Sequence, residues 1–99
     1  MDLRDIATLD LHDATLVSVQ LDWPKRHCRF VIRPVSQAPS QPHSLDFCDV
    51  TLLHIPQQRL WGRSVSINSA SFDSGVVAIE MQSGDVIEIT ATSVSYGAL

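Results

Sequence analysis

Histidine and acidic side chains that stand together are the first candidates for chemistry in this sequence. His12 and Asp13 are adjacent in LDLHDATL, residues 9–16. A histidine beside a carboxylate is the pairing used in general acid–base catalysis. Neighbours on an extended chain point to opposite faces, however, so these two are not expected to form one dyad. Asp13 is instead expected to accept hydrogen bonds in a turn before a strand, with His12 packed or bonded across to another strand.

The other histidines do not complete a motif. His27, His43 and His54 have neither helical nor H-x-H spacing, so the sequence predicts no metal site. A general base could be built from His27 or His54 and an acid, but no motif orders such a site. Phosphate loops, dinucleotide fingerprints and nucleophile elbows are absent from the sequence. We therefore predict a protein that is not an enzyme and that uses no cofactor.

The composition is that of one globular domain over residues 1–99, with 44% hydrophobic and 18% charged residues. Apolar runs are too short for a membrane span, and the acidic N-terminus does not resemble a signal peptide, so we expect a cytoplasmic protein with no membrane contact. Cys28 and Cys48 are too few for a disulfide scaffold and are expected to be reduced and mostly buried. Whether they lie close together depends on the strand order.

The net charge of −4 is unevenly distributed. Residues 25–33 hold Lys and Arg but no acid, whereas residues 73–88 hold acids but no base. An acidic protein binds nucleic acid poorly, because affinity comes from neutralised phosphates, so no direct nucleic-acid contact is expected. The charge suits a basic protein partner, and ordinary solubility explains it equally well.

Alternation of apolar and polar residues predicts an all-β domain. The expected strands cover residues 14–22, 27–35, 44–55, 64–72, 75–82 and 85–94. The third is less regular, which is compatible with a bulge, and LRDIATL (3–9) is compatible with one short helical turn. Residues 36–43 are polar and are expected to form a surface loop. The architecture that follows is an antiparallel meander of about six strands, curled into a small barrel or folded into a sandwich.

Turn chemistry predicts how these strands pair. Residues 73–75 and 82–84 are each expected to form a three-residue loop, because glycine then occupies the third, left-handed position. Residues 23–26 are expected to form a four-residue connection, in which proline suits the turn. The predicted pairs are Ile79–Ile87, Val77–Ile89, Phe72–Val76, Ile67–Met81, Leu21–Cys28 and Val19–Phe30. Alternation also places Val17, Val19 and Leu21 on one face.

Two features allow a structural or a functional interpretation. Trp61, beside Gly62 in LWGRS (60–64), is expected either to cover one end of the sheet or to anchor a protein interface. Arg63 is able to pair with the acidic hairpin in either case. The outer face of the last hairpin is polar and half acidic, as expected for a solvated face or for a flat surface that meets a basic partner. Its residues are Glu80, Gln82, Glu88, Thr90 and Thr92.

Three motifs, LHDATL (11–16), LWGRS (60–64) and EMQSGDVIEI (80–89), resemble those of a group of small bacterial proteins. Such proteins are similar to immunity proteins of contact-dependent growth inhibition and related polymorphic toxin systems. The resemblance implies a protein that binds and neutralises a cognate toxin domain, typically a nuclease with a basic substrate-binding surface. It identifies no binding residues.

Charge and residue type, rather than the resemblance, select the residues expected to contact the partner. They are Asp10, Asp13, Trp61, Arg63, Asp73, Glu80, Asp85 and Glu88. Two other functions stay open. One is a housekeeping β-domain that binds a cellular protein or self-associates, for example as a homodimer through an exposed edge strand. The other is a small hydrolase.

Overall fold

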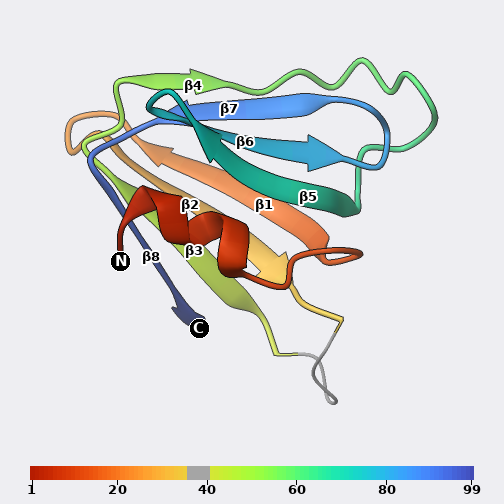
Figure 1. The fold of residues 1–99 in the computed structure, drawn as a ribbon, viewed down its shortest axis with the longest axis horizontal. Coiled ribbons are helices and arrows are strands. Elements are labelled where there is room, and N and C mark those ends of the chain that lie inside the picture. The colour runs from red at the N-terminus through yellow and green to blue at the C-terminus, as the bar shows by residue number, and fades with distance from the viewer. Residues whose placement is uncertain (36–40) are drawn as a thin grey trace.

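The computed structural model describes residues 1–35 and 41–99 and shows two packed antiparallel sheets of four strands (Figure 1). A 3-10 helix, η1 (Leu3–Thr8), precedes the strands. These are β1 (Thr15–Asp22), β2 (His27–Arg33), β3 (His43–Cys48), β4 (Leu52–His54), β5 (Ile67–Asp73), β6 (Val76–Met81), β7 (Val86–Thr90) and β8 (Ser93–Ala98). The first sheet has the order β1-β2-β3-β8 and the second β4-β7-β6-β5. The all-β class, the antiparallel pairing and the sandwich alternative are confirmed.

The described residues contain eight strands rather than about six, because two predicted strands bend and contribute to both sheets. The segment expected over 44–55 is β3 and β4. The segment expected over 85–94 is β7 and only the first two residues of β8, which continues to Ala98. They stay paired throughout, β3 with β8 and β4 with β7. At the bend, residues 49–51 oppose only residues 91 and 92, so one chain carries an extra residue. A bulge of this kind lets a strand turn from one sheet into another.

We call this bend, residues 48–51 with 90–92, the corner. Asp49 adopts a positive φ of 54° there. The Thr92 amide donates to the Cys48 carbonyl at 3.0 Å, and the Thr51 amide donates to the Thr90 carbonyl at 2.8 Å. The two chains therefore change sheets together, without leaving these backbone groups unpaired.

The core lies between the sheets and comes from the predicted alternation. Phe30 of β2 and Phe47 of β3 are fully buried and meet edge to face, with ring centroids 5.5 Å apart. The opposite sheet contributes Val77, Ile79 and Met81 of β6, with Ile87 and Ile89 of β7.

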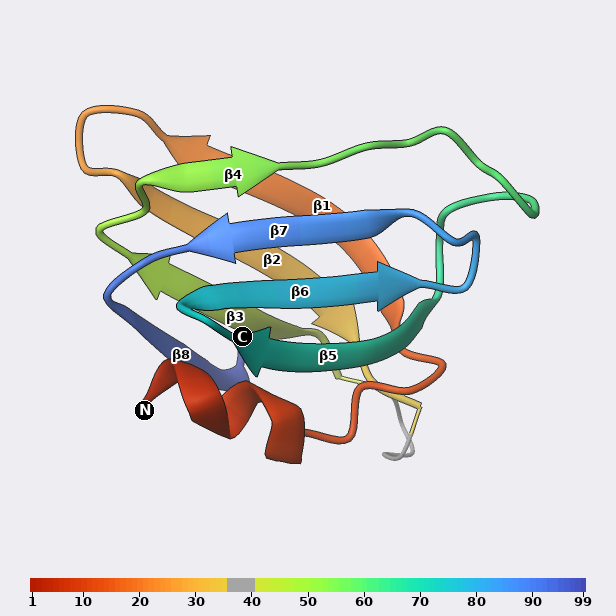
Figure 2. The ribbon, with the colours of Figure 1, turned by 45° about the horizontal axis from the view of Figure 1, so that its top comes forward.

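η1 closes one flank of the sandwich. Asp2 and Asp5 form a capping box at its start, and Leu3 and Ile6 are buried. The helix lies beside β5 and near β8 in both views (Figures 1 and 2), and the Val94 amide donates to the Met1 carbonyl at 3.5 Å. The helical turn predicted over residues 3–9 is confirmed. Within the described residues, no helix has the length and apolar character needed to cross a membrane.

Two of the three predicted turns have the expected register. The turn at 82–84 pairs Ile79 with Ile87, and the turn at 23–26 pairs Leu21 with Cys28. The loop predicted over 73–75 is wrong, because Phe72 pairs with Val77 across a two-residue Ser74-Gly75 turn in which both residues have positive φ. A register shift between Ile67 and Ser69 then restores the predicted pairing of Ile67 with Met81.

A second register shift, between Leu16 and Ser18, changes which residues of β1 face the core. Leu16 and Val19 pack against the core, whereas Val17 is 51% exposed. The prediction that Val17 shares a buried face with Val19 is therefore wrong. Strict alternation ends at a bulge, because the extra residue reverses the side on which the next side chain lies.

The two cysteines lie on neighbouring strands but point to opposite faces of the sheet. Cys28 is buried, and burial, together with the nearby charge of Asp46, raises the pKa of its thiol to about 11. Cys48 is exposed, so the expectation of two mostly buried thiols is wrong for this residue. Both are free, and opposite orientation keeps their sulfurs from forming a disulfide. The loop predicted over 36–43 falls mainly on residues 36–40, which lie outside the described residues.

The bulge in β1 predicts different costs for two neighbouring valines. Val19→Ala should lower the free energy of unfolding by about 1–2 kcal/mol, because the substitution removes two methyl groups that pack against the core. Val17→Ala should change it by less than about 0.5 kcal/mol, because that side chain already faces solvent. Urea unfolding in dilute solution measures both. Equal costs for the two variants would contradict the bulged register.

Candidate interaction surface

The outer face of the second sheet carries the acids that the sequence placed on the last hairpin. Directly paired residues of neighbouring strands point to the same side, so the register of β4 to β7 defines this face. We call it the acidic face. Its described residues are Leu52, His54, Ser69, Ser71, Asp73, Val76, Ala78, Glu80, Val86, Glu88 and Thr90. Three of them are carboxylates and none is Lys or Arg. The strands that carry this face, β4, β7, β6 and β5, lie in the foreground of Figure 2.

The acids surround a centre of small side chains. Glu88 on β7 lies opposite Ala78 on β6, which in turn lies opposite Ser71 on β5. Glu80 accepts a hydrogen bond from the Asn68 side chain at 2.6 Å, and Glu88 Oε1 lies 3.5 Å from His54 Nδ1. A partner can therefore approach the sheet closely while it meets carboxylates whose positions are already restrained.

Asp13 lies next to this face, at the edge of β5. Its backbone has a positive φ of 65°, and its carboxylate accepts a hydrogen bond from the side-chain amide of Gln82. His12 donates from Nδ1 to the carbonyl of Asn68 at 2.9 Å, which confirms the predicted bond across to another strand. The expected opposite orientation of His12 and Asp13 is wrong, because the chain turns here and brings His12 Nε2 to 3.6 Å from the carboxylate. Both side chains are more than half exposed, so the pair is a solvated contact.

Asp10 lies elsewhere. Burial raises the pKa of Tyr96 on β8, and the charge of Asp10 raises it further, so Asp10 stands close to the first sheet. Asp10 is not one of the paired strand residues that define the acidic face.

Asp85 is not a surface residue. It is 2% exposed, and its carboxylate accepts hydrogen bonds from the Ser83 hydroxyl at 2.7 Å and from the amides of Gln58 and Arg59 at 2.9 and 3.0 Å. These bonds, with that of Ser83 the strongest, lower the pKa of Asp85 despite the opposing effect of desolvation. The carboxylate holds the long β4–β5 connection against the β6–β7 turn, so its predicted place on a partner-binding surface is wrong.

Trp61 rests on the same turn. A Cβ atom built on Gly84, which has a φ of 92°, would come within 2.8 Å of the Trp61 ring, so the indole lies directly on this glycine. The Trp61 amide donates to the Ser83 carbonyl at 3.0 Å. The residue is nevertheless 80% exposed, so it does not seal one end of the core as the structural interpretation expected. Arg63 forms no ion pair with the acidic hairpin among the described residues.

The outer face of the first sheet is different, because Asp46 pairs there with Arg29 of the basic segment. Asp46 accepts hydrogen bonds from Arg29 Nε and from the Ser44 hydroxyl, each at 2.7 Å, and lies 3.3 Å from His27 Nε2. Desolvation would raise the pKa of Asp46, but these hydrogen bonds and positive charges lower it. Sequence reasoning missed this cluster. The signal was the alternation of Ser44 and Asp46, which places both on the Arg29 face once β2 and β3 are paired.

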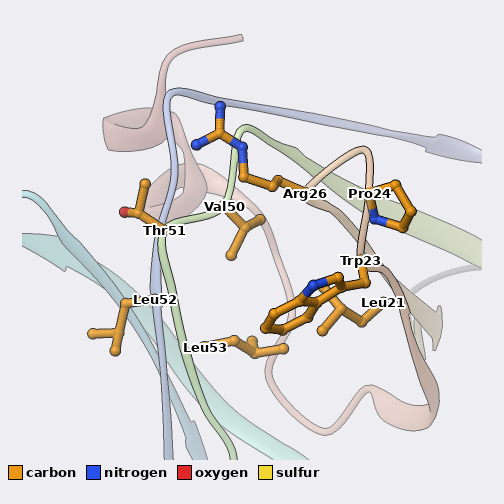
Figure 3. A pocket seen from close by; sticks show the side chains of 8 residues that line it. All are labelled: Leu21, Trp23, Pro24, Arg26, Val50, Thr51, Leu52 and Leu53. Atoms are coloured by element: carbon orange, nitrogen blue, oxygen red, sulfur yellow. The ribbon is translucent and has the colours of Figure 1, made fainter.

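An apolar pocket of about 760 Å³ lies between the end of β1 and β4 (Figure 3). The indole of Trp23 reaches over Leu21 toward Leu53, and Arg26 extends away from it. The remaining walls are Pro24, Val50, Thr51 and Leu52. The sequence predicted only a turn at Trp23-Pro24. It gave no sign of the pocket, because the wall formed by residues 50–53 depends on the corner. The lining suits an apolar group and contains no acid–base pair.

Within residues 1–35 and 41–99, no group of three or more His, Cys, Asp or Glu side chains is placed to hold a metal ion.

Comparison with known proteins supports the fold alone. No family model matches the chain, and no curated protein is significantly similar in sequence. A solved structure of an uncharacterised protein from Neisseria gonorrhoeae is similar, with a TM-score of 0.60 and 9% identity. The match covers 89% of this chain and 93% of that one. At this identity, the two proteins share an architecture, and nothing about activity follows.

The bonds to Asp85 predict a pH-dependent contribution to stability. Because the folded-state pKa lies below the ordinary value of 3.8, the carboxylate stabilises the fold above that pH, and the contribution disappears as pH falls through the lower value. Asp85→Asn should lower the thermal unfolding midpoint by several degrees near neutral pH. The difference in midpoint between this variant and the wild type should become smaller as the pH falls. Glu88→Gln, at an exposed position, is the control, and its unfolding midpoint should differ little from that of the wild type. A difference in midpoint between Asp85→Asn and the wild type that does not change with pH would contradict a stabilising role of the ionised carboxylate.

Proposed function

We propose that the protein is an immunity protein, which acts in the cytoplasm by binding a cognate toxin domain and needs no active site of its own. The observation that carries the proposal is the acidic face, where Asp73, Glu80 and Glu88 occur with no Lys or Arg among the outward residues. The resemblance of the LHDATL, LWGRS and EMQSGD motifs to immunity proteins supports the same function.

The distribution of charge favours this face over the rest of the molecule. On the first sheet, Arg29 is neutralised by Asp46, and Arg26 lies 3.9 Å from Asp49. Among the described ion pairs, none joins a Lys or Arg to Asp73, Glu80 or Glu88, so these cations do not compensate the negative charge of the acidic face. A nuclease presents a cationic cleft to its substrate, and an opposed acidic surface accelerates encounter and excludes like-charged partners.

Trp61 is the candidate anchor at the end of this surface. Large aromatic side chains contribute disproportionately to binding when they become desolvated. Its ring is supported by Gly84 on one side and is 80% exposed, so a partner is able to cover the remaining surface without rearranging the fold.

The housekeeping β-domain is the second candidate. The observation that favours it is the apolar pocket beside Trp23, which lies on the opposite flank from η1 and shares only Leu52 with the acidic face. A partner bound through this pocket would be insensitive to changes at Glu80 and Glu88.

A charge-matched pair of variants tests the proposal. The ligand is the purified C-terminal domain of a large secreted protein encoded beside this gene. Glu80→Lys with Glu88→Lys should weaken binding by about tenfold or more, mainly through slower association, because both changes lie on the acidic face. Asp10→Lys with Asp22→Lys changes the net charge equally but away from that face, and should weaken binding much less.

The readouts are surface-immobilised binding kinetics at two salt concentrations and inhibition of the domain's toxicity. Asp85 is left intact, since its replacement would disturb the β4–β5 connection. Equal effects of the two variants would remove the acidic face from the interface. Failure of the wild-type protein to bind or inhibit any neighbouring toxin domain would reject the immunity function itself.

A further inference from the structure

Residues 59–63 (RLWGR) of the β4–β5 connection, which we call the tip, are held in place by their backbone. The Arg59 amide donates to the Asp85 carboxylate at 3.0 Å, and the Trp61 amide donates to the Ser83 carbonyl at 3.0 Å. The connection passes beside the β6–β7 turn in both ribbon views (Figures 1 and 2). The fold therefore fixes the position of the tip before any partner binds.

The side chains of the tip are nevertheless left to solvent. Trp61 is 80% exposed and Leu60 58%. Arg59 and Arg63 are exposed as well, and neither takes part in an ion pair among the described residues. Gly84 supports one face of the indole and leaves the rest of the ring accessible. Tryptophan and arginine are the residues most enriched at the energetic centres of protein interfaces, so the tip has the composition of a binding element.

The charge of the tip is opposite to that of the acidic face. Glu80 on β6 pairs with Val86 on β7, next to the turn that supports Trp61. The tip and the acidic face therefore come together at one end of this hairpin, yet the tip holds two arginines and no acid. A uniformly cationic partner would be attracted by the acidic face and repelled by the tip.

We propose that the tip binds carboxylates that border an apolar recess on the toxin domain, while the acidic face meets the cationic surface of the same domain. The inference rests on the proposed function and adds the sign of the partner's charge at this end of the surface. Leu60 and Trp61 enter the recess. Arg59 and Arg63 pair with the carboxylates at its rim, since a guanidinium binds a carboxylate through two parallel hydrogen bonds.

The fixed backbone suits the tip to this role. Because the bonds to Asp85 and Ser83 are already made in the free protein, a partner does not have to order the loop, and binding restricts only side chains. The two signs of charge also favour one orientation. A reversed partner would set its cations against the arginines and its carboxylates against Glu80 and Glu88.

Charge reversal at the tip tests the sign of the partner's surface. The ligand is the purified toxin domain encoded beside this gene. R59E/R63E should weaken binding by about tenfold or more, mainly through faster dissociation, because contacts at close range are lost. R4E/K25E changes the net charge equally at exposed positions on η1 and in the β1–β2 turn, and it should not weaken binding. Both variants gain the same long-range attraction to a cationic domain, so the difference between them reports contact at the tip.

A matched pair of tryptophan variants tests the anchor. Trp23 and Trp61 are both 80% exposed, and only Trp61 belongs to the tip. W61A should weaken binding by about 30-fold, whereas W23A should weaken it by less than about threefold. Equal effects of the two variants would overturn the role of Trp61 in the recess.

Thermal unfolding establishes that each variant is folded. R63E alone, which leaves the positive φ of Arg59 untouched, is the second variant and should weaken binding by about threefold or more. Folded R59E/R63E protein that binds as tightly as the wild type, or more tightly, would overturn the inference and leave the proposed function standing. Wild-type protein that binds no neighbouring toxin domain would reject the proposed function, and this inference with it.

Discussion

The corner is the constraint on which the rest of this fold depends. Two chain segments that stay hydrogen-bonded to each other, 43–54 and 86–98, pass from one sheet to the other at the same point. Asp49 provides the extra residue, with a positive φ, and the Thr92 hydroxyl lies 3.1 Å from its carboxylate. Because both chains turn together, the two sheets share one core and the sandwich needs no long crossover connection.

The corner also sets the shape of the uncovered flank. It directs residues 50–53 against the β1–β2 turn, where the Val50 amide donates to the Arg26 carbonyl at 2.8 Å. The apolar pocket beside Trp23 is a consequence of this contact. η1 closes the opposite flank with Leu3 and Ile6, whereas Leu21 and Trp23 beside the pocket stay exposed.

The charge of the surface depends on which carboxylates are bound by other groups of the fold. Asp46 is engaged by Arg29 and Ser44, and Asp85 by backbone amides and Ser83, so neither projects as a free anion. Asp73, Glu80 and Glu88, in contrast, lie on the outer face of the second sheet. An acidic sequence thus becomes a molecule with one acidic face, and that difference matters for encounter with a cationic partner.

The sequence by itself determined the features that arise from local periodicity. Alternation identified the strands and buried Phe30, Ile79 and Ile87, and glycine at position 84 set the register of the β6–β7 hairpin, because both signals act over a few neighbouring residues. Only the tertiary structure decided the corner, the exposure of Val17 and the burial of Asp85. Each depends on backbone groups distant in the chain, such as the amides of Gln58 and Arg59 that meet Asp85, and no spacing in the sequence encodes which distant groups will pair.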